Sequence, residues 1–250
     1  MRADREIAHG KWLSERDAEW VWGWGSPAGR VRAQHRAELI AEGALLRPGV
    51  TAVEIGCGTG LFTELLAATG ASIVAVDISE ALLARAQQRQ LPPDRVQFVR
   101  GRFEEVSLPG GFDAVIGSSV LHHLDVDEAL AAICRLLKPG GRVSFAEPNM
   151  LNPQVFLERH PPFFLKEYYA YVSPDETAFV RHAFKRVLER AGLVNVSITP
   201  FDWLHPATPP ALIPVLRAAG RIAERMPLLR EFSGSLLIRA QVPLVSTVRS

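Results

Sequence analysis

The stretch V-E-I-G-C-G-T-G at residues 53–60 decides the fold. It leads from an apolar run into three glycines at alternate positions, and a helical period follows from Leu61. Glycine lets a strand-to-helix turn adopt positive φ and approach a ligand closely. The N-terminus of the next helix offers free N–H groups and a partial positive charge. The stretch alone therefore leaves two interpretations, a nucleotide-like ligand at a helix start or a tight turn without a ligand.

Apolar runs and helical periods alternate on both sides of this turn. Near-continuous apolar strands alternating with helices imply a parallel sheet that is covered on both faces. Strands are predicted at residues 51–55, 72–76, 96–99, 112–116, 142–146, 194–199 and 235–240. Helices are predicted at residues 30–46, 61–68, 80–90, 128–137 and 176–191, after a loop over residues 23–29.

Composition narrows the class of protein. The chain has 250 residues, 48% of them hydrophobic, which fits a globular α/β protein and argues against disorder. A net charge of +1 gives no sign of a nucleic-acid-binding surface. The two cysteines have no metal-ligand spacing, and no metal site is expected. The N-terminal residues include several charges and no apolar signal-peptide core, and no apolar run is long enough to span a bilayer. A cytoplasmic location is therefore expected.

The second informative feature is an acidic residue that follows the glycine stretch. Asp77 closes the second predicted strand, 17 residues after Gly60. A carboxylate at this point can accept both hydroxyls of a ribose. The glycine spacing differs from the G-x-G-x-x-G pattern of dinucleotide-binding proteins. The stretches F-D-A-V-I at 112–116 and L-L-K-P-G-G-R at 136–142 stand at the fourth and fifth strands.

With these motifs, and with V-L-H-H-L at residues 120–124, the sequence resembles the class I S-adenosylmethionine-dependent methyltransferases of small molecules. The resemblance implies a doubly wound, mainly parallel seven-stranded α/β sheet whose sixth and seventh strands are antiparallel. We expect an N-terminal helical cap over residues 1–48 and a methyltransferase domain over 49–250. Lid insertions are expected at about 148–174 and, before the last strand, at 202–233.

The same resemblance implies roles for individual residues toward S-adenosylmethionine. Glu54 and the glycine loop would hold its methionine part, Asp77 its ribose and Ile78 its adenine, while Ser118 would line the floor. One position departs from the family pattern, because an acidic residue after the third strand is replaced by Arg102 and Phe103. A backbone group or Glu104 would then accept the adenine amino group, or Phe103 would stack on the adenine ring. The loop residues expected at the cofactor are Gly56, Cys57, Gly58 and Gly60.

Three side chains are candidates for proton transfer to or from an acceptor. His122 and His123 follow the fourth strand and Glu147 ends the fifth, so all three are expected at the carboxyl edge of the sheet beside the ligand crevice. Histidine titrates near neutral pH and suits a general base. Each residue also has a structural interpretation, because either histidine could cap a helix or contact the cofactor, and Glu147 could bind the turn.

Aromatic segments are the candidates for the acceptor pocket. Trp22 and Trp24 belong to the N-terminal segment, which related enzymes often use to build that pocket. Tyr168 and Tyr169 lie in the long connection after the fifth strand, and such long loops are usually functional when they are not disordered. Packing on the sheet remains the alternative for both groups.

Residues 207–230 contain an amphipathic period over 212–226, with four arginines against one glutamate. Such a helix either lies on an anionic membrane surface or packs on its own domain or a second subunit. The protein is expected to be a monomer or a homodimer. The leading hypothesis is methyl transfer to a small-molecule acceptor, amphipathic or linked to a lipid or sugar. The alternatives are a non-catalytic cofactor-binding or membrane-docking module and a nicotinamide-dependent oxidoreductase.

Overall fold

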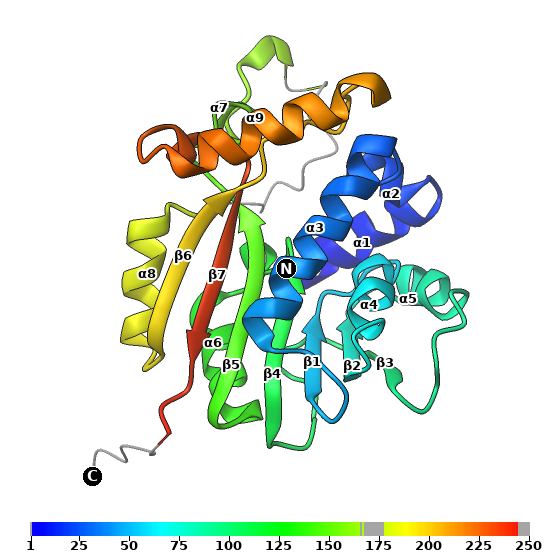
Figure 1. Cartoon of the computed structure of the whole chain (residues 1–250). Coiled ribbons are helices and arrows are strands. Elements are labelled where there is room, and N and C mark those ends of the chain that lie inside the picture. Colours follow the sequence, from blue (N-terminus) through cyan, green and yellow to red (C-terminus); the bar gives the residue numbers. More distant parts are fainter. Residues whose placement is uncertain (1, 166, 168–177, 245–250) are drawn as a thin grey trace.

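The protein is described by a computed structural model that covers residues 2–165, 167 and 178–244. Seven strands form one sheet in the order β3-β2-β1-β4-β5-β7-β6 (Figure 1). The strands are β1 Thr51–Ile55, β2 Ser72–Asp77, β3 Val96–Arg100, β4 Phe112–Ser118, β5 Leu137–Pro148, β6 Val194–Phe201 and β7 Ser235–Gln241. The seven predicted strands and the α/β class are therefore confirmed.

Helices flank the sheet and cross the end at which the parallel strands finish (Figure 1). The α-helices are α1 Arg2–Ser14, α2 Ala18–Val21, α3 Pro27–Ala44, α4 Leu61–Ala67, α5 Glu80–Gln87, α6 Val126–Leu136, α7 Pro153–Arg159, α8 Arg181–Arg190 and α9 Ile213–Arg225. Short 3₁₀ turns are η1 Leu121–His123, η2 Phe163–Leu165, η3 Pro210–Leu212 and η4 Leu229–Phe232. None of the described helices has both the length and the apolarity that a bilayer crossing needs.

Several element boundaries differ from the prediction. The loop expected over residues 23–29 is shorter, because Ser26 caps α3 by accepting from the Gly29 amide at 2.9 Å and Pro27 occupies the first turn. Strand β5 starts at Leu137 rather than Arg142, with a register shift against β4 that absorbs the intervening turn. Helix α8 starts at Arg181, and the earlier part of its predicted range includes residues outside the described part.

The direction of one strand also corrects an expectation. Strand β7 runs antiparallel to both β5 and β6. Strand β6 is therefore parallel to the first five strands, so the antiparallel sixth strand was wrong and only the seventh is reversed. Two consecutive antiparallel pairings restore the original direction at the edge of the sheet.

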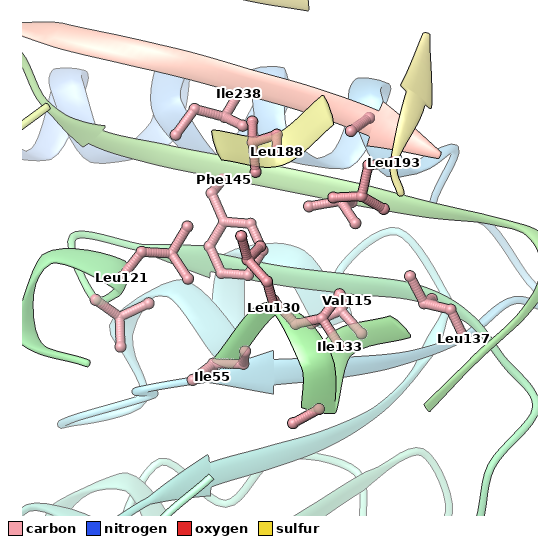
Figure 2. Close-up of a cluster of buried hydrophobic side chains, with 14 of the residues drawn as sticks. Ile55, Val115, Leu121, Leu130, Ile133, Leu137, Phe145, Leu188, Leu193 and Ile238 are labelled. Carbon is pink, nitrogen blue, oxygen red and sulfur yellow. The ribbon is translucent and has the colours of Figure 1, made fainter. Parts of the chain in front are cut away.

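Two apolar cores lie on the two faces of the sheet. On one face, Leu130 and Ile133 of α6 and Leu188 of α8 pack against Phe145, which is fully buried at the centre of the cluster (Figure 2). Truncation of such a phenylalanine to alanine costs about 3–5 kcal/mol of folding stability.

The second core joins the N-terminal segment to the sheet. Ala37 and Ile40 of α3 are buried in it together with Leu66 of α4 and Ala114 of β4. Helix α3 therefore shares a core with the strands. The predicted boundary at residue 48 between a cap and a domain stays a prediction.

Candidate active site

A cavity of about 1060 Å³ opens at the carboxyl end of the parallel strands. From β1 the chain moves outward to β2 and β3, and it then returns to the other side of β1 for β4 and β5. Such a reversal of strand order leaves a crevice between the neighbouring loops, where open α/β sheets bind their ligands. The fold thus places the cavity beside the β1–α4 turn, as the sequence indicated.

The glycine loop forms one wall of this cavity. Gly56 and Gly58 line it together with Cys57, and both glycines adopt positive φ, 66° and 53°. A Cβ atom on Gly58 would lie 3.3 Å from the Trp22 ring, so the gap between loop and ring suits a residue without a side chain. Gly60 is the N-cap residue of α4 and is not among the residues that line the cavity.

Glu54 does not line the cavity. It is 1% exposed at the end of β1, and burial raises the pKa of its carboxyl to about 7, although the Thr63 hydroxyl opposes the shift. Its Oε2 atom has no hydrogen-bond partner in the described part of the chain. The role expected for Glu54 at the methionine end of a cofactor stays a prediction, and a direct contact is not favoured by this position.

Asp77 links the glycine loop to the end of β2. Its Oδ2 atom accepts from the Gly58 amide and its Oδ1 atom from the Ser79 amide, each at 2.8 Å. Burial raises the pKa of this carboxyl, while the two amide hydrogen bonds oppose the shift. Each carboxylate oxygen has a second lone pair, so Asp77 can still accept hydroxyl groups of a ribose from the cavity that it lines. The loop and Asp77 fit S-adenosylmethionine.

Three residues expected at the adenine end of the predicted cofactor site lie in the wall of the cavity. Ile78, Arg102 and Phe103 line the cavity. The Arg102 guanidinium is also ion-paired with Glu105, and Phe103 is only 4% exposed because it packs with the core. Glu104 lines the cavity as well, so the alternatives for the adenine contacts remain open.

Arg36 is a further candidate site residue that was not predicted from the sequence. This arginine lines the cavity although it is 3% exposed, and burial lowers the pKa of its guanidinium to about 10. It donates to the Ser119 hydroxyl at 2.9 Å, the Ser118 hydroxyl at 3.3 Å and the Ser235 hydroxyl. Its hydrogen bonds within the described residues go to neutral oxygens, and its Nε atom has no partner there. Asp202 and Glu147 act on this cation electrostatically, but its hydrogen-bond partners are neutral, so the guanidinium can still bind an anionic group.

A sequence signal for Arg36 did exist. Residues 33, 37, 40 and 44 form a buried apolar stripe along α3, and Arg36 occupies a core position within that stripe. Arginine is almost never fully buried unless it serves a partner. An arginine inside an otherwise apolar helical period could therefore have been selected as a functional residue.

His122 and Glu147 form a buried pair beside the cavity. The Nδ1 atom of His122 lies 2.7 Å from Oε2 of Glu147, and the two side chains are 3% and 0% exposed. The other carboxylate oxygen accepts from the Val120 and Leu121 amides at 3.0 and 2.9 Å. Burial alone would raise the pKa of Glu147, but hydrogen bonds from His122 and the two amides outweigh it and hold that pKa below its usual value.

The charge state of Glu147 fixes the chemistry of its partner. An ionised Glu147 accepts the proton on Nδ1 of His122, which leaves Nε2 as the basic nitrogen of the ring. Since His122 lines the cavity, this arrangement can remove a proton from a group held there. Both residues were predicted from the sequence as candidates for proton transfer, but their pairing was not predicted.

His123 has a different environment. Its Nδ1 atom lies 3.2 Å from Oε2 of Glu6 in α1, and its ring centroid is 4.2 Å from that of His122. It therefore connects η1 to the N-terminal helix as well as lining the cavity. His122, in contrast, contacts Glu147 near the end of β5.

The N-terminal segment forms part of the cavity wall and contacts the glycine loop. Thr59 donates its hydroxyl proton to Glu19 at 2.9 Å, and Arg89 donates to the Thr59 carbonyl at 2.7 Å while also pairing with Glu19. These contacts tie α2 to the loop. They position Trp22 in the cavity wall.

Trp24 forms another part of this wall and is 8% exposed. Its ring packs edge-on against Phe62 at 5.4 Å, with the Arg32 and Arg36 guanidinium groups each 5.1 Å from its centroid. Tyr168 and Tyr169, the other residues expected at the acceptor, lie outside the described residues.

Both predicted insertions contribute to the cavity. Asn152 and Val155 line it from the first insertion, and Trp203 and His205 line it from the second. Asn152 also donates to the Phe232 carbonyl at 2.8 Å, so the two insertions contact each other. These lining residues were not identified individually from the sequence, because their spacing carries no motif.

Comparison with known proteins identifies the family of the chain. Residues 53–145 match the model of a methyltransferase domain family. A ubiquinone biosynthesis O-methyltransferase of Methylococcus capsulatus is 30% identical over 194 residues, which cover 71% of this chain and 81% of the relative.

Two solved structures show the fold in complex with cofactor or its product. The N-methyltransferase NodS from Bradyrhizobium japonicum WM9, in complex with S-adenosylhomocysteine, matches with a TM-score of 0.63 at 17% identity, over 95% of this chain and 98% of that one. A phosphoethanolamine N-methyltransferase of Haemonchus contortus, in complex with S-adenosylmethionine, matches with a TM-score of 0.64 at 17% identity, over 90% of this chain and 56% of that one. Together with the glycine loop and Asp77, these relationships show that the chain is an enzyme of the class I S-adenosylmethionine-dependent methyltransferase family and uses S-adenosylmethionine as its cofactor.

Proposed function

We propose that this enzyme methylates a hydroxyl group of a small amphipathic acceptor, with His122 as the general base. The observation that carries the proposal is the buried His122–Glu147 pair at the cavity. A neutral hydroxyl is a poor nucleophile until it loses its proton, so oxygen acceptors profit from a positioned base. The relative from Methylococcus capsulatus is named as an O-methyltransferase, which supports the same choice.

The cofactor is held by residues on three elements in this proposal. The glycine loop approaches its methionine part, Asp77 accepts its ribose hydroxyls, and Arg36 binds its carboxylate. S-adenosylmethionine supplies a methyl carbon bound to a positively charged sulfur, which is already an excellent leaving group. The Arg36 cation suits this carboxylate because it lines the same cavity as the glycine loop, beside the end of β4 and the start of β7, with no anion among its described hydrogen-bond partners.

The proton of the acceptor hydroxyl passes to Nε2 of His122. Glu147 keeps the ring in the required tautomer through Nδ1 and stabilises the imidazolium that forms. The amides of Val120 and Leu121 keep Glu147 ionised, so the carboxylate orients the base and does not compete for the proton. The closed N-terminal segment excludes water and holds the acceptor close to the cofactor.

The walls of the cavity favour an acceptor with an aromatic or apolar part. Trp22, Trp24 and Trp203 all line it, and many polar and charged residues line it as well, so an acceptor with both an apolar and a polar part suits it. Membership of the methyltransferase family excludes the nicotinamide-dependent oxidoreductase and favours an enzyme over a non-catalytic module. Peripheral membrane contact through residues 212–226 is a separate hypothesis, on which the proposed reaction does not depend. Assembly as a monomer or homodimer stays a prediction.

Methyl transfer from labelled S-adenosylmethionine tests the proposed reaction. A matched pair of acceptors, catechol and 1,2-diaminobenzene, offers hydroxyl or amino groups on the same ring. We expect label on oxygen, with His122→Asn losing most of the activity toward catechol while still binding S-adenosylhomocysteine. Label on nitrogen alone, or full activity of His122→Asn toward catechol, would overturn the proposal.

A further inference from the structure

Helix α9 lies across the end of the sheet (Figure 1). Most of its residues are exposed. Ile213 and Gly220 are its buried residues. A Cβ atom on Gly220 would lie 3.1 Å from that of Trp203, so this position faces the body of the protein. Glu224 also faces inward, because its Oε1 atom accepts from the Asp202 amide at 2.9 Å. These contacts fix the rotation of the helix about its axis.

The opposite face of α9 is apolar. With 100° per residue, Val215, Ala219, Ile222 and Met226 form one stripe, which points away from Gly220 and Glu224. Val215 is 64% exposed, Ile222 61% and Met226 47%. The helix therefore does not bury its apolar face against its own domain within the described residues.

A row of cations flanks this stripe. Arg217, Arg221 and Arg225 follow one another at four-residue steps and are all exposed. In the described part of the chain they form no ion pair, and the nearby Glu224 is turned inward. The outward surface of α9 therefore combines exposed apolar side chains with uncompensated positive charge.

We propose that α9 docks the enzyme on an anionic phospholipid bilayer, with the stripe 215/219/222/226 among the acyl chains and the arginine row on the phosphates. Helices with this division of residues lie in the plane of the interface. A second copy of the chain is a poorer occupant. Pairing of two α9 helices would bring the arginine rows together without carboxylates to neutralise them.

Docking through α9 has a consequence for the active site. Trp203, which packs against Gly220, also lines the cavity, as do residues 204–207. The bilayer would thus face the wall that the second insertion contributes, and the acceptor would be a lipid-resident molecule with a hydroxyl-bearing head and a hydrocarbon tail. This substrate class rests on the proposed function, whereas lipid binding by α9 does not.

Vesicle sedimentation with the full-length protein tests the docking surface. Phosphatidylcholine vesicles with and without phosphatidylglycerol are the probes. We expect binding to the anionic vesicles, weakened by added salt and reduced on the order of 30-fold in Arg221→Gln/Arg225→Gln, because each arginine contributes separately to the attraction. Ile222→Asp is expected to lose binding as well. Arg190→Gln, an exposed arginine on α8, is the matched control and is expected to bind like the wild type.

Two further measurements make the outcomes distinct. S-adenosylhomocysteine affinity and methylation of catechol are measured for each variant, and we expect both to be unchanged. A wild type that methylates catechol but ignores anionic vesicles overturns the docking surface and leaves the proposed function intact. Self-association that Ile222→Asp abolishes, without vesicle binding, overturns docking in favour of a second copy. Vesicle binding by an enzyme that fails to methylate catechol supports docking and contradicts the proposed function.

Discussion

Nδ1 of His122 lies 2.7 Å from Oε2 of Glu147, and this contact joins the turn after β4 to the end of β5. The remaining oxygen of Glu147 is held by two backbone amides of the same turn. The carboxylate is thus fixed by its surroundings, and the ring of His122 is oriented by the carboxylate. A base arranged this way needs no reorganisation when it accepts a proton.

Replacement of His122 by asparagine should lower kcat for a hydroxyl acceptor by about 10²–10⁴-fold, the usual contribution of a general base. Glu147→Gln should lower it as well and shift its pH dependence, because an amide can present the wrong group to Nδ1. The measurement is kcat against pH, with S-adenosylhomocysteine binding as the check on folding. His123→Asn provides the comparison. A larger loss there than in His122→Asn would assign the base to His123.

Gly58 and Gly49 provide a matched pair for the glycine loop. Both have positive φ, 53° and 86°, but a Cβ atom meets Trp22 at Gly58 and nothing within 4 Å at Gly49. Valine at either position carries similar backbone strain, on the order of 1–3 kcal/mol. Calorimetry should show that Gly58→Val loses S-adenosylhomocysteine binding whereas Gly49→Val retains it. Equal affinities for the two variants would remove the loop from the cofactor site.

The roles of Arg36 and Asp77 in cofactor binding can be distinguished by comparing the affinities of two ligands. S-adenosylhomocysteine carries a carboxylate that 5′-methylthioadenosine lacks, while both contain the ribose. Arg36→Met should lose about 1.5–3 kcal/mol of affinity for S-adenosylhomocysteine only, the range for a hydrogen bond to a charged group. Asp77→Asn should weaken both ligands alike. If Arg36→Met weakens both to the same extent, its cation serves the fold and not the carboxylate.

The sheet was predictable because its strands are short apolar runs between turns. All seven were located from sequence, and the β1–α4 turn was identified from its glycines. The direction of β6 was not predictable in the same way, since apolar residues do not encode which neighbour a strand pairs with. Strand β7 enters between β5 and β6, and only tertiary pairing decides that order.

Site residues were predictable where a residue type with a known chemical role stands at the end of a parallel strand. Asp77, His122 and Glu147 were all selected on that ground, and all line the cavity or contact a residue that does. Arg36 was not, because its partners are serines that are distant in sequence. Its distance to them is set by the packing of α3 on the sheet, which no local pattern records.

Glu54 should make stability depend on pH. Its pKa is about 7 in the folded protein, mainly through burial, against 4.5 as the reference for an unfolded chain. The folded state therefore binds the proton more tightly, so this contribution is fully present below about pH 4.5 and is lost as pH rises through about 7. The loss is on the order of 3 kcal/mol, since each unit of pKa corresponds to about 1.4 kcal/mol.

The measurement is denaturant unfolding of the cofactor-free protein and of Glu54→Gln across this range of pH. The stability of Glu54→Gln relative to the wild type should rise as pH increases, because glutamine stays neutral. Asp113→Asn is the control. Partial burial alone would raise the pKa of Asp113, but hydrogen bonds from Lys138 and Thr51 hold that pKa below its usual value. The contribution of Asp113 to folding stability is therefore lost only at acidic pH. A constant difference between Glu54→Gln and the wild type at every pH would show that Glu54 ionises normally and that its environment is wetter than its burial indicates.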